Sequence, residues 1–169
     1  SPQFQLKLFE EIESHGKDLS LKLYGARALM SLRLEKNWGA WTLDFRPDFT
    51  AAESGLDTFI NWDKQFIGKK AALEEKKQGP KKKLVTMIID TKDIDVTNDE
   101  AILKNNKCVG YITSGGYAHY VQKSMALGYV PTELSKQDTI LSVEINGKMY
   151  AAHVTDKPLY DANGGKMKS

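Results

Sequence analysis

The pattern of apolar and polar positions changes along the chain near residue 80. Before that point apolar residues recur at helical spacing, and after it they gather in short runs rich in β-branched side chains. Residues 4–12 carry the first helical pattern, which His15-Gly16 ends. Residues 21–36 carry a stronger one, which Asn37 and Gly39 stop. The apolar side of this second predicted helix consists of Leu23, Ala26, Leu29 or Met30, Leu32 and Leu34.

Three further elements are predicted before residue 80. Thr50 and Glu53 stand three residues apart, as in a capping box at the start of a short helix. Residues 57–62 are compatible with a strand. Residues 68–78, rich in Ala and Lys, predict a helix that Gly79-Pro80 ends.

The second part of the chain predicts short strands joined by hairpins. Strand-like runs occupy residues 84–89, 101–103, 109–113, 124–130, 141–145 and 149–154. Asn105-Asn106-Lys107 and Asn146-Gly147 are hairpin signals, the second being the stronger. Strands at this spacing suggest a small barrel or sandwich. We place a boundary near residues 78–83 and divide the chain into residues 1–80 and 81–169.

Residues 109–131, VGYITSGGYAHYVQKSMALGYVP, combine a strand, a glycine pair and an aromatic cluster. Ser114-Gly115-Gly116 predicts a tight turn or a close approach of the backbone to a ligand. Tyr117, His119 and Tyr120 follow, and a second strand completes a predicted strand-turn-strand unit. The polar, Gly-rich tail at residues 161–169 is expected to be loosely held.

Composition limits the function without naming it. The 169 residues are 41% hydrophobic and 27% charged, so a packed core is expected. The net charge of +2 gives no argument for nucleic acid, and no apolar run reaches membrane-spanning length, so neither partner is expected. Lys76, Lys77 and residues 81–83 form a basic cluster, which beside Glu74 and Glu75 reads as a solvated linker rather than a patch for nucleic acid or an anionic membrane.

Few residue types offer chemistry. Cys108 is the single cysteine, expected as a small buried residue, and no disulfide within the chain can form. There is no G-x-G-x-x-G or Walker loop, and the three histidines lack metal-ligand spacing, so no metal site is expected. These features suit a cytoplasmic protein or one of an organellar matrix. The start at Ser1, without Met, suggests a cut or a fragment end.

Glu35 is the residue most suggestive of binding. It ends the apolar helix, where the helix dipole disfavours a carboxylate, so it needs a partner. Arg33, Lys36 or solvent could supply one. Alternatively, a carboxylate beside a pocket accepts paired N–H donors, such as those on the aminopyrimidone edge of a pterin.

Several motifs, in the same order, resemble the glycine cleavage T-protein (aminomethyltransferase) superfamily. They are GARALMSLRLEK at residues 25–36, AESGL at 52–56, FIGKKAAL at 66–73, NDE at 98–100, the stretch 109–131 and KPLYD at 157–161. The likeness covers nearly everything after residue 21. It is strongest to the C-terminal region of dimethylglycine and sarcosine dehydrogenases.

The resemblance implies an α+β fold and a folate site. Residues 1–80 would be the helical and mixed part of a folate-binding domain, and residues 81–169 a small antiparallel β-barrel. The cofactor would be tetrahydrofolate, its pterin held by Glu35. Lys64 would lie near the anionic tail of the folate, and Tyr117 would contact a ring.

The resemblance also implies that this chain carries part of an enzyme. The catalytic aspartate of these enzymes lies upstream, in a stretch with no counterpart here, and FAD would belong to the parent enzyme only. We therefore expect no catalytic residue in this chain, no activity from it alone, and a partner in the remainder of the enzyme or another chain.

Three functions stay open. The first is oxidative N-demethylation of a small methylated amine with one-carbon transfer to folate. The second is an aminomethyltransferase of the glycine cleavage system or a related folate-dependent demethylase. The third is a non-catalytic binding or scaffold domain of the same fold. The expected compartment is the cytoplasm, or the mitochondrial matrix in a eukaryote.

Overall fold

The computed structural model describes residues 1–168 and shows an N-terminal helical region followed by a closed barrel. The helices are α1 (Gln5–Gly16), α2 (Ala26–Glu35), α3 (Lys69–Gln78) and the short terminal α4 (Gly165–Lys168). The strands are β1 (Lys82–Ile89), β2 (Ala101–Lys104), β3 (Lys107–Ala118), β4 (Lys123–Pro131), β5 (Ile140–Ile145) and β6 (Lys148–Thr155). Single 3₁₀ turns are η1 (Pro2–Phe4), η2 (Lys17–Leu19), η3 (Asp57–Phe59) and η4 (Thr132–Leu134).

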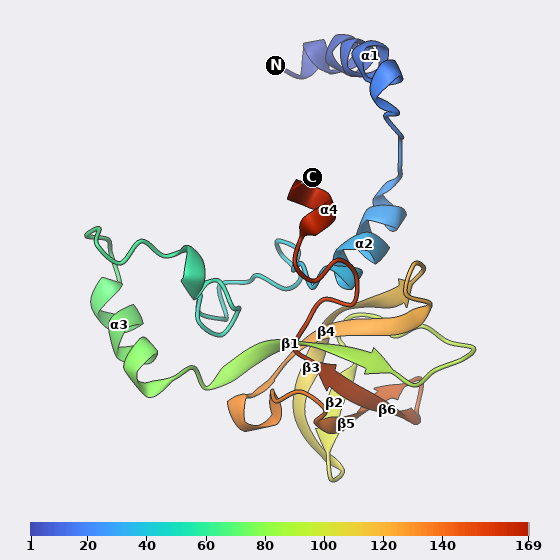
Figure 1. Ribbon diagram of the computed structural model, residues 1–169. Helices are drawn as coiled ribbons and strands as arrows, with labels where there is room; N and C mark the ends of the chain where they lie inside the picture. Colours follow the sequence, from blue (N-terminus) through green and yellow to red (C-terminus); the bar gives the residue numbers. More distant parts are fainter. Residues whose placement is uncertain (169) are drawn as a thin grey trace.

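The six strands close into a barrel in the order β1-β4-β3-β2-β5-β6, with every pairing antiparallel. Closure gives every strand a paired neighbour on both sides. The α+β class with a C-terminal antiparallel barrel is thus confirmed. Figure 1 shows α2 lying over the barrel, α3 beside it and α1 standing away from it. No helix within residues 1–168 is both long and apolar enough to span a bilayer.

The predicted hairpins form with the expected turn chemistry. Asn105 and Asn106 have φ of 51° and 60°, and Asn146 and Gly147 have φ of 49° and 75°. Two successive positive φ angles are the type I′ geometry that suits the twist of paired strands. The Asn-rich turns therefore set the registers of β2 with β3 and of β5 with β6.

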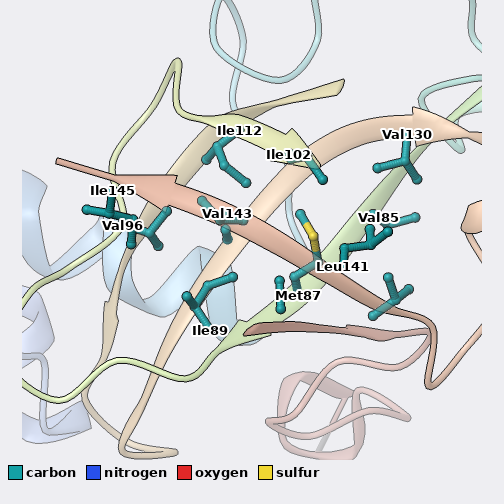
Figure 2. Packing of buried hydrophobic residues seen from close by; sticks show 13 residues of the cluster. Val85, Met87, Ile89, Val96, Ile102, Ile112, Val130, Leu141, Val143 and Ile145 are labelled. Atoms are coloured by element: carbon teal, nitrogen blue, oxygen red, sulfur yellow. The ribbon is translucent and has the colours of Figure 1, made fainter. Parts of the chain in front are cut away.

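The barrel interior is an apolar core built by side chains that face inward from all six strands (Figure 2). Val96, from the loop after β1, fills the core between strands. The fully buried branched residues Ile102, Ile112 and Val143 are 0% exposed. Each buried side chain of this size contributes roughly 1.5–3 kcal/mol by leaving water.

A second, smaller core attaches α2 to the barrel. Leu34 is 1% exposed and packs with Ala118, Met125 and Leu127 from β3 and β4. The prediction of one helix over residues 21–36 was wrong at its start, because α2 begins at Ala26. Most of its predicted apolar side is not buried: Leu29, Met30 and Leu32 are 46%, 42% and 48% exposed. The contacts of α2 with the barrel and the turn after β3 come from its second half, from Ser31 to Glu35, so its first half is uncovered.

The glycine pair does not form a turn. Ser114, Gly115 and Gly116 lie within β3, and the chain reverses over residues 119–122, where Gln122 has φ of 55°. A register shift between Ile112 and Ser114 bends β3 instead. The alternative prediction was a close approach of the backbone to a ligand. In the structure the backbone at Gly115 closely approaches another part of the chain, since a Cβ there would stand 2.6 Å from the carbonyl oxygen of Val96.

Two other local predictions were wrong for clear physical reasons. Residues 57–62 contain η3 and no strand, since no strand lies beside them among residues 1–168 to supply ladder hydrogen bonds. Cys108 is exposed, because it follows the Asn105-Asn106 turn at the outer end of β3. The reciprocal bonds of a capping box between Thr50 and Glu53 form, each at 3.1 Å, but residues 51–55 make turns and not the predicted short helix.

The C-terminal tail is better held than its composition suggested. Asp161 accepts a hydrogen bond from Lys36, and residues 165–168 form α4. The last predicted tail residue, Ser169, lies outside the described residues.

The contact between Gly115 and Val96 predicts an intolerant position. We expect Gly115→Ala to lower the free energy of unfolding by about 1–3 kcal/mol, because either β3 or the Val96 loop must shift. Chemical denaturation measures the change. Gly25→Ala is the matched control, since a Cβ there meets nothing within 4 Å. Equal stability of the two variants would contradict the close approach.

Candidate functional site

The last two turns of α2 form hydrogen bonds with the end of β3 and with the turn that follows it. The Ser31 hydroxyl donates to the Tyr117 carbonyl at 2.8 Å and accepts from the His119 amide at 3.2 Å. One turn later, Oε1 of Glu35 accepts from the amides of Tyr120 (2.7 Å) and Val121 (3.4 Å). Positions i and i+4 share one helix face, so Ser31 and Glu35 act together on residues 117–121.

Glu35 is buried, and only one of its two oxygens has a partner. The residue is 1% exposed, and Oε2 has no hydrogen-bond partner in the part of the chain that the structure describes. A carboxylate has about four acceptor positions, and an unmade bond to a buried charged group is costly. Oε2 is therefore an acceptor for which residues 1–168 provide no donor.

The expected partners of Glu35 have other tasks. Arg33 donates to Asp44 at 2.9 Å, and Lys36 donates to the carbonyl of Asp161 at 2.7 Å. Of the partners considered for Glu35, neither Arg33 nor Lys36 pairs with it. The amides of the β3–β4 turn take that place, because the turn folds back over the end of α2.

Asp44 forms a second connection between α2 and strand β3 of the barrel. It is 0% exposed and accepts from Nη1 of Arg33 at 2.9 Å, the Ala40 amide at 2.7 Å and the Ser114 hydroxyl at 2.8 Å. The Thr113 hydroxyl donates to the same carboxylate. A buried carboxylate with this many donors, one of them charged, is fully satisfied.

The loop that carries Asp44 is itself bound to β4. The Tyr129 hydroxyl donates to the Asp44 carbonyl at 3.0 Å and shares a 2.7 Å hydrogen bond with Ser54. Burial raises the pKa of the Tyr129 hydroxyl, so it stays protonated and able to donate. Phe49 stacks on the Tyr129 ring at a centroid distance of 3.4 Å.

Aromatic side chains surround the Glu35 junction. Tyr117 and His119 meet edge to face at 5.1 Å, and Tyr120 meets Tyr160 in the same way at 4.6 Å. Tyr117, His119 and Tyr120 are exposed. Exposed ring faces beside a buried acceptor suit a planar ligand with hydrogen-bond donors on its edge.

The structure brings together two of the three residues predicted for the site. Glu35 and Tyr117 both lie at the junction of α2 and β3, where the Tyr117 carbonyl binds Ser31, one helical turn before Glu35. Lys64 precedes α3 in the chain; its side chain is exposed, and its carbonyl accepts from Nζ of Lys69 at 2.9 Å. Figure 1 shows α3 apart from α2. Among the described residues, no hydrogen bond or ion pair joins Lys64 to Glu35.

Sequence reasoning missed Ser31, Asp44 and Tyr120. The spacing of Ser31 and Glu35 by one helical turn was a readable signal that both face the same neighbour. Asp44, an acid among Trp41, Leu43 and Phe45, also hinted at a buried carboxylate. The amide of Tyr120 gave no signal, because any residue supplies a backbone N–H.

Other features of the described chain do not compete with this junction. Residues 1–168 contain no cluster of three His, Cys, Asp or Glu side chains that could hold a metal ion. A cavity of about 830 Å³ lies between residues 50–62, α3 and the start of β1, but Glu35, Lys64 and Tyr117 do not line it. The unpartnered buried carboxylate oxygen, rather than cavity size, identifies the candidate site.

Comparisons with known proteins agree with this picture. A family profile described as "GCVT N-terminal domain" matches residues 1–64, and one described as "Glycine cleavage T-protein C-terminal barrel domain" matches residues 82–161. Human mitochondrial dimethylglycine dehydrogenase is 38% identical over 154 residues, which are 90% of this chain and 18% of that protein. The aminomethyltransferase of Synechocystis sp. is 36% identical over 162 residues, 95% of this chain and 42% of that protein.

A solved structure shows the same fold. The crystal structure of glycine cleavage system aminomethyltransferase T from Bartonella henselae matches with a TM-score of 0.83 and 28% identity, over 94% of this chain and 44% of that one. The chain thus spans less than half the length of each of these relatives.

The Asp44 contacts predict a strong effect of a small change. We expect Asp44→Asn to cost about 3–5 kcal/mol of stability, because it leaves the buried Arg33 charge unpaired and turns an amide donor toward other donors. Urea unfolding measures the loss. Asp48→Asn is the control: Asp48 pairs with Arg46 at 2.6 Å, but both side chains are about half exposed, so the expected change is under about 1 kcal/mol. A small loss for Asp44→Asn would show that the anchor is dispensable.

Proposed function

The chain belongs to the glycine cleavage T-protein family, and on this premise we propose that it is the tetrahydrofolate-binding C-terminal portion of a one-carbon enzyme of the dimethylglycine or sarcosine dehydrogenase type. In this proposal the parent enzyme oxidises an N-methyl group of a small amine. The region described here holds the folate that accepts the one-carbon unit.

The observation that carries the proposal is the unpartnered Oε2 of Glu35. A pterin presents an exocyclic amino group and a neighbouring ring N–H on one edge, which together match the acceptor positions of a carboxylate. Oε1 is already occupied by the amides of Tyr120 and Val121, so Oε2 is the oxygen left for the pterin. The residues present therefore fit the group that the family uses.

Holding the folate is a matter of position rather than of acid–base chemistry here. Tetrahydrofolate supplies the nucleophilic amine that takes up the one-carbon unit. In this proposal Glu35 orients the ring system through Oε2, and the exposed Tyr117 ring contacts a face of the ligand. A fixed orientation brings the folate amine within reach of the carbon to be transferred, and such placement is a large part of catalysis. Lys64 belongs to the proposal only as a cation for the folate's anionic tail.

The remainder of the enzyme is the proposed partner. Several large apolar side chains of η1 and α1 are exposed, among them Phe4, Leu8, Phe9 and Ile12, at 61%, 61%, 45% and 52%. Apolar surface of this extent normally meets another protein surface. We propose that residues 1–80 are one part of a larger folate-binding domain, that residues 81–169 are the barrel domain, and that FAD, where present, belongs to the parent enzyme.

The second candidate function is an aminomethyltransferase of the glycine cleavage system or a related folate-dependent demethylase. Its support is coverage: the chain matches 42% of an aminomethyltransferase but only 18% of a dimethylglycine dehydrogenase. A flavin domain upstream in the same gene favours the dehydrogenase, and its absence favours the transferase. A non-catalytic domain of this fold would bind no folate. The cytoplasm, or the mitochondrial matrix in a eukaryote, is the proposed compartment.

Glu35→Gln tests the folate assignment. Glutamine keeps an oxygen for the Tyr120 amide but replaces Oε2 by an NH₂ group that would face the pterin donors. We expect the full-length parent to lose tetrahydrofolate affinity by roughly 10- to 100-fold, the worth of a charged hydrogen bond. Calorimetry measures it, with exposed Glu144→Gln on β5 as control. Full affinity in Glu35→Gln would remove Glu35 from the site.

A second test concerns the chain by itself. We expect the 169-residue chain to show neither aminomethyl transfer nor amine oxidation, because it holds no residue assigned to the chemical step. Product formation from dimethylglycine, sarcosine or an aminomethyl donor with tetrahydrofolate is the assay, and the full-length parent is the positive control. Turnover by the short chain would show that it contains catalytic groups of its own.

A further inference from the structure

The C-terminal segment returns to the end of α2 and binds the backbone of the residue that carries the proposed pterin contact. The Tyr160 amide donates to the Glu35 carbonyl at 3.1 Å. The next residue on each side also pairs: Nζ of Lys36 donates to the Asp161 carbonyl at 2.7 Å and lies 3.4 Å from Oδ2 of the same residue. Residues 35–36 and 160–161 are thus joined by three contacts.

The Lys36–Asp161 pair is shielded from water. The two side chains are 16% and 10% exposed, unlike the surface pair Lys7–Glu11, which is 71% and 49% exposed. Ion pairs in open solvent are worth little, whereas partly buried ones interact more strongly and fix geometry. The positive Nζ of Lys36, the residue that follows α2, also interacts favourably with the negative C-terminal end of the helix dipole.

Residues 159–160 of the same segment pack near the turn whose amides bind Glu35. Leu159 and Val121 both pack against the second core. The Tyr160 ring meets the Tyr120 ring edge to face at 4.6 Å. Tyr120 and Val121 are the two residues whose amides bind Oε1 of Glu35, so Tyr160 packs directly on one of the two donor residues, and Leu159 shares a core with the other.

Asp161 also holds the start of α4. Its Oδ1 accepts from the Lys166 amide at 3.3 Å, and the Lys166 ammonium lies 5.0 Å and 5.8 Å from the ring centres of Tyr160 and Tyr120. Burial alone would raise the pKa of the Asp161 carboxyl, but the Lys166 amide and Lys36 hold it below its ordinary value. Asp161 is therefore charged at neutral pH.

From these contacts we propose that Lys36 and Asp161 form a latch that keeps residues 159–161 against the Tyr120–Val121 turn, and that this latch positions the Glu35 carboxylate for its ligand. Lys36 and Asp161 act through the turn and do not touch the folate. The positioning of a ligand rests on the proposed function; the order of the turn does not. Without the latch, the two amides would be free to leave Oε1, and Glu35 would adopt other rotamers.

The test uses Lys36→Met in the full-length parent, with Lys92→Met as control, because Lys92 is exposed in the loop between β1 and β2. Hydrogen exchange of the Tyr120 and Val121 amides, measured without ligand, reports the turn directly. We expect at least tenfold faster exchange in Lys36→Met and an unchanged rate in Lys92→Met. Tetrahydrofolate affinity, measured by calorimetry, should fall by about tenfold in Lys36→Met only.

Asp161→Asn and the double variant sharpen the test. The Asp161 carbonyl still accepts from Lys36 in Asp161→Asn, so its effect should be smaller than that of Lys36→Met. The double variant should be no worse than Lys36→Met, as expected for two members of one pair. Wild-type exchange at Tyr120 and Val121 in Lys36→Met overturns the latch. Faster exchange with unchanged folate affinity overturns its positioning role, and faster exchange in a parent that binds no folate supports the latch and overturns the proposed function.

Discussion

The buried ion pair between Arg33 and Asp44 is the contact on which the candidate site depends. Arg33 lies on α2 and Asp44 on the loop after it, and the Asp44 carboxylate also binds the hydroxyls of Thr113 and Ser114 on β3. The Asp44 carbonyl binds Tyr129 on β4. One residue thus connects the helix, its following loop and two strands. Removing water from two charges is costly, and the cost is met only when every partner is in place, so this contact favours a single arrangement of α2 on the barrel.

Given that arrangement, α2 ends with a carboxylate in an unusual state. Leu34 enters the second core while Glu35, the next residue, is buried with one oxygen satisfied and one not. A buried polar atom without a hydrogen-bond partner lowers stability, and such atoms are expected at binding sites, where a ligand supplies the missing hydrogen bond. The bent strand β3 makes this geometry available. Gly115 lets Val96 approach, and the turn after β3 presents the amides of Tyr120 and Val121 to Glu35.

The same junction links the two ends of the sequence. Tyr160 and Asp161 come from beyond the last strand, yet they bind residues 35 and 36 near the start of the chain. The N-terminal half thus supplies the acceptor, the barrel supplies the turn that orients it, and the C-terminal segment supports the turn. This division of tasks explains why motifs scattered from residue 25 to residue 161 occur in one sequence, although no two neighbouring motifs form a site by themselves.

The sequence alone determined the elements whose cause is local. The strands after residue 82, the Asn-based hairpins, the helix before Gly79 and the Thr50 capping box follow from side-chain pattern and turn chemistry within a few residues. It also singled out Glu35, because a carboxylate at the end of an apolar helix is anomalous wherever it occurs. Tertiary structure decided what depends on distant partners. Residues 57–62 form no strand because no strand lies beside them, and Ser114-Gly115-Gly116 stays extended because β4 pairs with it. Glu35 binds the amides of Tyr120 and Val121, 85 and 86 residues away. Arg33 binds Asp44, and Lys36 binds Asp161. A sequence shows which groups need partners, but only the folded backbone determines which partners come within hydrogen-bonding distance.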